Sequence, residues 1–302
     1  MPSWSALVEE VNAAGTTYDL TRRKYLAELS EHTGRNTIVY YSGWLQRGHL
    51  LGQSGVDFSV TDLDKDGLMA TVHQLDRNLG LDLVLHTPGG DTAATESLVH
   101  YLRQMFDGDV RAIVPHLALS AGTMIALSCR EIVMGKHSSL GPIDPQIGGM
   151  PAHAVVEEWT RAHAETKADP TRMPFWQLVI SKYPPGLIGA CEKAIEWSEE
   201  MACEWLATGM FKDEPEATEK AKAVIDEIGS HAATKAHNRH ISAAKAESMG
   251  LKVVALEDDQ VLQEAVLTVH HACMLTMSDT PIVKLIENQN GIAYAQQFSV
   301  AG

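Results

Sequence analysis

Apolar and polar positions along the chain change between two periods, and this change predicts an α/β fold. Short β-branched and aromatic runs, typical of buried strands, occupy residues 36–41, 81–86, 110–115 and 132–134. Between them, apolar residues recur at helical spacing in 62–79, 91–108 and 121–129. Because short connections join strand to helix to strand, we expect a parallel sheet with right-handed crossovers.

The second half of the chain is less regular at first. Residues 135–185 are rich in Gly, Pro and polar residues, and we expect an irregular insertion there, which in a compact domain is often functional. Helical spacing returns in 187–211, 214–228 and 261–277. The sequence contains no internal repeat and no clear linker, so it gives no reason to divide it into independent folding units.

Composition narrows the classes of partner. The 302 residues carry a formal net charge of −15 and a pI near 5.3, which argues against nucleic acid as a partner and against an anionic membrane surface. No apolar run approaches the roughly 20 residues of a membrane span, and the first residues do not have the pattern of a signal peptide. We therefore expect a cytoplasmic protein with no membrane insertion.

Two patterns that suggest metal sites fail on spacing. The four cysteines contain no CxxC pair, so we expect reduced thiols rather than a zinc or dithiol site. Residues 62–67, DLDKDG, match the first half of an EF-hand loop, but His73 stands where the bidentate Glu is required. We expect no metal and no cofactor, and no phosphate-binding glycine motif occurs.

The chemistry is concentrated in two segments, HTPGGD at 86–91 and LSAGT at 119–123. Ser120 is the candidate nucleophile, and small neighbours leave room for a tetrahedral intermediate. The amide of Ala121 opens a predicted helix, and the twin glycines Gly89 and Gly90 can turn their amides toward the same point. Both segments follow strands of one parallel sheet. Because the carboxyl ends of parallel strands lie at the same end of a sheet, we expect the two segments to meet there. The pattern indicates a serine hydrolase with a backbone oxyanion hole.

These segments resemble the serine dehydrogenase proteinase type of Clp-fold serine peptidases. Two further segments share the resemblance, LGPIDPQ at 140–146 and KLIENQNG at 284–291. That family is related to signal peptide peptidase A and to the Clp protease subunit. The resemblance implies an α/β, ClpP/crotonase-like spiral of β-β-α units with added helices at both ends. It also implies a homo-oligomer. The corresponding division is an N-terminal helical extension at 1–33, a peptidase domain at 34–290 and a C-terminal tail at 291–302.

The general base is the least determined part of the site. The Clp subunit carries a histidine about 25 residues after its serine, where this chain has Pro145. Relatives of signal peptide peptidase A use a lysine, which loses its proton when desolvated. Lys182 follows an apolar stretch and is our preferred base, whereas Lys167 lies among acidic residues; His137 remains a further alternative.

The sequence therefore predicts an ATP-independent serine peptidase that cleaves peptides or unfolded polypeptide segments. Ser120 and Lys182 form the predicted dyad, and Gly89, Gly90 and Ala121 supply the predicted oxyanion amides. Two alternatives remain open: a catalytically inactive, oligomeric peptide-binding scaffold of the same fold, and a crotonase-type acyl-CoA enzyme.

Overall fold

The computed structural model describes residues 8, 18–229 and 239–298. Its centre is a seven-stranded sheet in the order β10-β5-β3-β2-β1-β11-β12. The strands are β1 (Asn36–Ser42), β2 (Leu81–His86), β3 (Val110–Val114), β5 (Ile132–Met134), β10 (Val253–Ala255), β11 (Ile282–Asn288) and β12 (Ala293–Gln297). The five strands from β10 to β1 run parallel, and β11 and β12 are antiparallel additions at one edge. The α/β prediction and all four predicted strands are confirmed.

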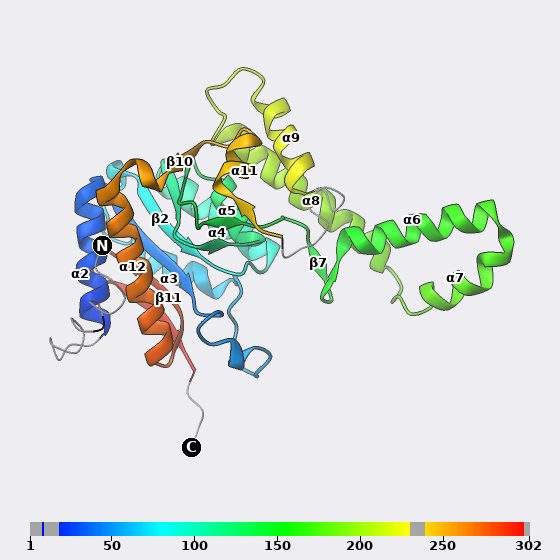
Figure 1. The fold of residues 1–302 in the computed structure, drawn as a ribbon, viewed down its shortest axis with the longest axis horizontal. Coiled ribbons are helices and arrows are strands. Elements are labelled where there is room, and N and C mark those ends of the chain that lie inside the picture. Colours follow the sequence, from blue (N-terminus) through cyan, green and yellow to red (C-terminus); the bar gives the residue numbers. More distant parts are fainter. Residues whose placement is uncertain (1–7, 9–17, 230–238, 299–302) are drawn as a thin grey trace.

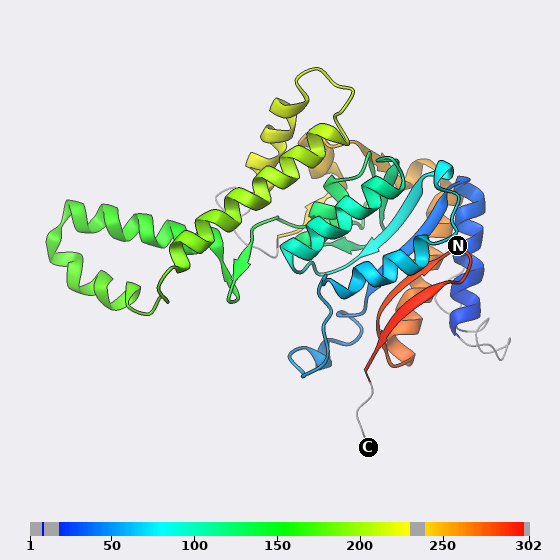
Figure 2. The ribbon, with the colours of Figure 1, turned by 180° about the vertical axis from the view of Figure 1, so that it is seen from behind.

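Helices cover both faces of this sheet (Figures 1 and 2). Successive strand residues point to opposite faces, and Val39 accordingly packs beneath α2 (Tyr18–Thr33) and α12 (Gln260–Asp279). Tyr40 faces the other layer. That layer contains α3 (Leu63–Val72), α4 (Thr92–Met105), α5 (Ala121–Leu127), α8 (Leu187–Thr208) and α9 (Ala217–Ile228). The predicted helices are confirmed, but α3 ends early, because His73 adopts an extended conformation and Gln74 follows with a φ of 68°.

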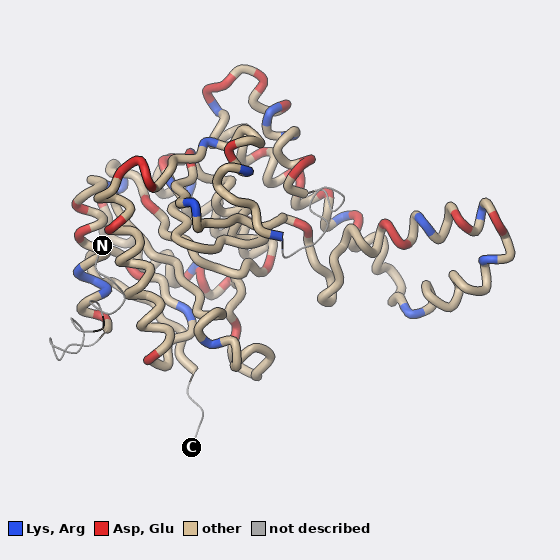
Figure 3. Tube along the Cα trace, viewed as in Figure 1, with Lys and Arg blue, Asp and Glu red and all other residues tan. Residues whose placement is uncertain are grey.

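We expected the segment 135–185 to be irregular, and this prediction was wrong. It forms the short strands β6 (Ser139–Leu140), β7 (Gln146–Ile147) and β8 (Met150–Pro151), then α6 (Ala152–Ala168), a 3₁₀ turn (Pro170–Arg172) and α7 (Met173–Ile180). Helices α6 and α7 form a hairpin that projects from the body, and we call α6 to α7 the arm (Figure 1). Charges of both signs alternate along it (Figure 3). The start of α6 packs on α8 through Ala152, Val155, Leu187 and Cys191, whereas Trp159, Phe175 and Leu178 farther along the arm are exposed.

The first helix and the last strand of the structure both contact the central sheet: α2 packs on one face of it, and β12 is its edge strand. Arg22 of α2 is 1% exposed and pairs with the buried carboxylate of Glu287 on β11. At the other end, β12 lies within the segment that we expected to be a tail, and it pairs with β11. No helix in residues 18–229 and 239–298 is long and apolar enough to cross a membrane.

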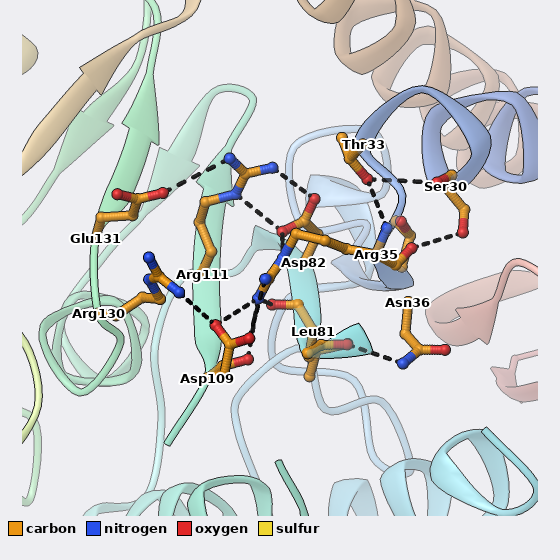
Figure 4. Close-up of polar contacts among 12 residues, drawn as sticks. Ser30, Thr33, Arg35, Asn36, Leu81, Asp82, Asp109, Arg111, Arg130 and Glu131 are labelled. Atoms are coloured by element: carbon orange, nitrogen blue, oxygen red, sulfur yellow. Dashed lines mark hydrogen bonds and ion pairs between the residues drawn. The ribbon is translucent and has the colours of Figure 1, made fainter. Parts of the chain in front are cut away.

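The amino ends of the parallel strands are held together by charge (Figure 4). Asp82 of β2 is fully buried and accepts hydrogen bonds from Arg35 at 2.8 Å and from Arg111 at 2.7 and 2.9 Å. Arg35 also bonds to Asp109. This network joins β1, β2 and β3 near their amino ends. Their carboxyl ends, at the other end of the sheet, remain available for a site.

Candidate active site

The two predicted loops meet at the carboxyl end of β2. The chain leaves β2 through Thr87, and a short strand, β4 (Leu117–Ala118), runs parallel beside it. The Thr87 amide donates to the Leu117 carbonyl at 3.1 Å, and the Leu119 amide donates to the Thr87 carbonyl at 3.0 Å. These two bonds hold the Ser120 loop directly against the glycine loop.

Ser120 has a strained backbone. Its φ of 51° and ψ of −115° lie in a region that residues with a side chain rarely adopt, and helix α5 begins at the next residue. A non-glycine residue is held there only when its surroundings force it, and such strain clusters at functional sites. Ser120 is partly exposed, so its hydroxyl is accessible from the pocket that it lines.

The glycines are required by the close approach of other backbone. Gly89 has a φ of 101°, and a Cβ there would lie 2.7 Å from Ser120 Cβ and 3.0 Å from the Ala121 amide nitrogen. A Cβ on Gly90 would lie 2.2 Å from the amide nitrogen of Val60. Val60 is bonded on both sides of Gly90, to the Gly89 carbonyl at 2.8 Å and from the Asp91 amide at 2.9 Å.

The amides of the two glycines differ in what they bind. The Gly89 amide donates to the side-chain oxygen of Thr87 at 3.2 Å. In the part of the chain that the structure describes, the amides of Gly90 and Ala121 donate to no protein acceptor. The pair Gly90 and Ala121 is therefore the better candidate for holding a developing oxyanion.

A pocket of about 270 Å³ lies over these groups. It is lined by Ser59, Pro88, Gly89, Gly90, Asp91, Thr92, Ser120, Ala121, Met124, Ile143, Pro145, Gln146 and Ser198. The ionisable group in this lining is Asp91, whose carboxylate caps α4 by accepting from the Ala94 amide at 2.7 Å, as the sequence predicted. The pocket therefore presents a hydroxyl and backbone amides, but neither lysine nor histidine.

The GPIDPQ segment forms one wall of the pocket and supports α5. The hydroxyl of Thr123 accepts from the Gly141 amide at 2.9 Å and lies 2.9 Å from the carbonyl oxygen of Ala118. Asp144 is 1% exposed, and its carboxylate lies 4.0 Å from Nε2 of His153 on the arm. The segment thus couples the nucleophile helix to the base of the arm.

The structure does not bring the predicted bases to Ser120. Lys182 is exposed just beyond the end of α7, and Lys167 is exposed in the last turn of α6, so both belong to the arm and its end. His137 is exposed in the turn after β5. The apolar residues before Lys182, which we expected to desolvate it, do not bury it within this single chain.

Sequence reasoning missed part of the pocket. Ser59 comes from the connection between β1 and α3, next to Val60, which binds the backbone of the glycine loop, and Ser198 comes from the middle of α8. Neither segment carries a motif, because their contribution depends on where tertiary packing places them. The available signal was the pair Gly89 and Gly90, because a Gly-Gly pair often marks a place where another backbone segment approaches closely. Here that segment contains Val60, which contacts Gly90.

Replacing Gly90 with alanine is expected to lower the free energy of unfolding by about 2 kcal/mol, because the new Cβ overlaps backbone that cannot move aside. Chemical denaturation measures the change. Gly189→Ala is the matched control, since that glycine lies in α8 with nothing within 4 Å of the added Cβ. Equal stability of the two variants would contradict the close approach of Val60.

Comparison with known proteins identifies the family. A profile of the ClpP-like SDH-type serine proteinases matches residues 16–267. The uncharacterized protein MJ1495 of Methanocaldococcus jannaschii is 30% identical over 194 residues, which are 64% of this chain and 59% of that protein. The uncharacterized protein MJ0137 of the same organism is 32% identical over 154 residues, 50% of this chain and 52% of that protein. The chain thus spans between half and three fifths of the length of these curated relatives.

Among solved structures, a mutant of the membrane-bound stomatin-specific protease 1510-N aligns with a TM-score of 0.39 at 17% identity, covering 68% of this chain and 79% of that one. The profile match includes β2, β4 and α5, which carry the candidate site. The chain belongs to the family of ClpP-like SDH-type serine proteinases.

Proposed function

We propose that this protein is an ATP-independent serine peptidase that cleaves peptides or unfolded polypeptide segments at Ser120. The observation that carries the proposal is the strained backbone of Ser120, held against the glycine loop at the mouth of a pocket. A serine in a regular helix or turn does not require this conformation. Membership of a serine proteinase family supports the same chemistry.

In the proposed mechanism, the Ser120 hydroxyl attacks the carbonyl carbon of the scissile peptide bond and gives its proton to a general base. The tetrahedral oxyanion receives hydrogen bonds from the amides of Gly90 and Ala121, with Gly89 shaping the loop. The base then returns the proton to the leaving amine, and water hydrolyses the acyl-enzyme. No step requires a metal, a cofactor or a nucleotide.

We propose Lys182 as the general base. For this role, the arm has to bring Lys182 close to Ser120. A lysine acts as a base when burial lowers its pKa, and the exposed position of Lys182 in one chain does not provide that burial. The arm presents exposed apolar side chains, among them Trp159, Phe175 and Leu178. Covering these side chains against a second copy would remove them from water, and we propose that the same contact desolvates Lys182. We therefore propose that the enzyme is a homo-oligomer.

A second candidate function follows from the pocket lining. Because neither lysine nor histidine lines the pocket in the described residues, the protein could instead be an inactive scaffold that binds peptides. The two functions differ in one property: an activated serine reacts with a fluorophosphonate, whereas an unassisted serine does not.

The test is covalent labelling of the purified full chain with a fluorophosphonate at pH 8 without ATP, followed by mass spectrometry of the labelled peptide. We expect labelling of Ser120. Lys182→Ala should abolish it, whereas the matched Lys167→Ala should not. Unlabelled wild-type protein would refute the peptidase and support the scaffold, while wild-type labelling of Lys182→Ala would refute the role of Lys182 alone.

A further inference from the structure

Three imidazoles lie together beneath the candidate active site. The rings of His86, His116 and His270 have centroids 5.5, 5.6 and 5.8 Å apart. His86 ends β2, immediately before Thr87, and His116 immediately precedes β4. The cluster thus lies at the root of both loops that form the site, although none of its rings lines the pocket.

His86 is the most enclosed member of the cluster. It is 0% exposed, and its ring lies 4.3 Å from that of Trp44 and 4.4 Å from that of Tyr41, centroid to centroid. Its Nδ1 accepts a hydrogen bond from the Leu117 amide at 3.3 Å. An accepting Nδ1 places the proton of a neutral imidazole on Nε2. Nε2 is buried and has no hydrogen-bond partner among the residues that the structure describes.

The bond from Leu117 to His86 completes the connection between the two loops. The backbone supplies the two bonds between Thr87 and the β4 segment described above. The Leu117 amide lies beyond their reach and would be an unpaired buried donor without the imidazole, which costs free energy. The side chain of His86 therefore provides a third bond, three residues before Ser120.

We propose that His86, in its neutral form, is a positioning residue of the active site: its Nδ1 holds the Leu117 amide and so aligns the Ser120 loop with the glycine loop. The inference rests on the proposed peptidase function. His86 does not touch the reacting atoms and acts through the β4 backbone. Protonation at Nδ1 would replace the acceptor with a donor facing the Leu117 N–H and release this bond.

Burial and the neighbouring imidazoles favour the neutral form of His86, and together they outweigh the backbone of Leu117, which acts in the opposite direction. Burial lowers the pKa of His86 well below its ordinary value, and the neighbouring His270 and His116 lower it further. Tyr41 of β1 bonds to Nδ1 of His270, and burial raises the pKa of Tyr41, which keeps the phenol uncharged. The outer neighbours are also imidazoles: His271 beside His270, and His137 and His240 near His116. None of these neighbours is a carboxylate that would stabilise an imidazolium.

Two variants separate the acceptor from the ring. In His86→Asn, the amide oxygen can accept where Nδ1 accepts, and the side chain does not titrate; in His86→Phe, the stacking ring remains and the acceptor is lost. We expect His86→Phe to slow fluorophosphonate labelling of Ser120 about tenfold at pH 8, with kcat for a peptide reduced and KM little changed. His86→Asn should recover the rate to within about threefold. The exposed His73→Asn is the control and should match the wild type.

The same series is measured from pH 5 to 8.5, where the ratio of His86→Asn to wild-type labelling rates should stay constant, since the wild type keeps its neutral imidazole and its acceptor across this range. Labelling of His86→Phe at the wild-type rate, or an equal loss in both variants, would overturn the proposal. Long-range ¹H–¹⁵N spectra of the histidines, with His86 assigned from His86→Asn, provide a readout independent of activity. A proton on Nδ1 at pH 8 would overturn the inference, whereas an unlabelled wild type with the expected tautomer would overturn the peptidase function instead.

Discussion

Ser120→Ala is expected to lower kcat/KM for a cleaved peptide by at least roughly a thousandfold, because it removes the nucleophile and leaves only binding and the oxyanion amides. The fold should be retained. Alanine is a smaller residue with the same backbone restriction, so it keeps the positive φ and adds no atom to the contact with Gly89. Hydrolysis of a fluorogenic peptide, measured beside a thermal melt, separates lost chemistry from lost structure.

The matched variant for this experiment is Ser198→Ala, which removes a buried hydroxyl from the lining of the same pocket. Ser198 lies within α8, in regular helical backbone and without free amides beside it. We expect this variant to retain most of the activity. Activity that survives Ser120→Ala and disappears in Ser198→Ala would reassign the nucleophile.

The two loops of the candidate site were predictable from sequence because their geometry is encoded locally. Gly89 and Gly90 follow an apolar strand, and Asp91 caps the next helix. The signals for the strand, the turn and the helix start therefore lie within a few residues of one another. The parallel order of strands then follows from the alternation of elements. Residues with such local signatures were placed correctly in the fold.

The remaining parts depend on tertiary placement that no local pattern encodes. The arm was missed because its helices expose Trp159 and Phe175, which obscures the one-sided apolar stripe of a packed helix. Lys182 was chosen for its apolar neighbours, but adjacency in sequence does not bury a side chain, and Lys182 is exposed just beyond the end of α7. His86 was read as the end of a strand, since its bond to Leu117 joins residues 31 positions apart.

The histidine cluster also predicts a loss of stability in mild acid. Burial lowers the pKa of His270 from 6.5 to about 3, with His271 and His116 adding to the effect, and the pKa of His86 is lowered well below 6.5 by burial and by His270 and His116. The folded protein therefore keeps both rings neutral at pH 5, while the unfolded chain protonates them below pH 6.5. Because the unfolded state then binds more protons, the free energy of unfolding falls as the pH falls.

At pH 5 the His270 ring alone is expected to account for a loss of about 2 kcal/mol relative to pH 7.5, and His86, His116 and His271, whose pKa values are also lowered, add to this loss. Carboxylates with lowered pKa values, such as Asp109, titrate below this window, so the interval between pH 6.5 and 5 reports mainly the histidines. Urea unfolding at several pH values measures the slope. His270→Leu should reduce that slope, whereas His73→Leu, at an exposed position outside the cluster, is the control variant. A slope that His270→Leu does not alter would mean that the ring already carries its proton in the folded protein at pH 5, and the enclosed neutral cluster would then be wrong.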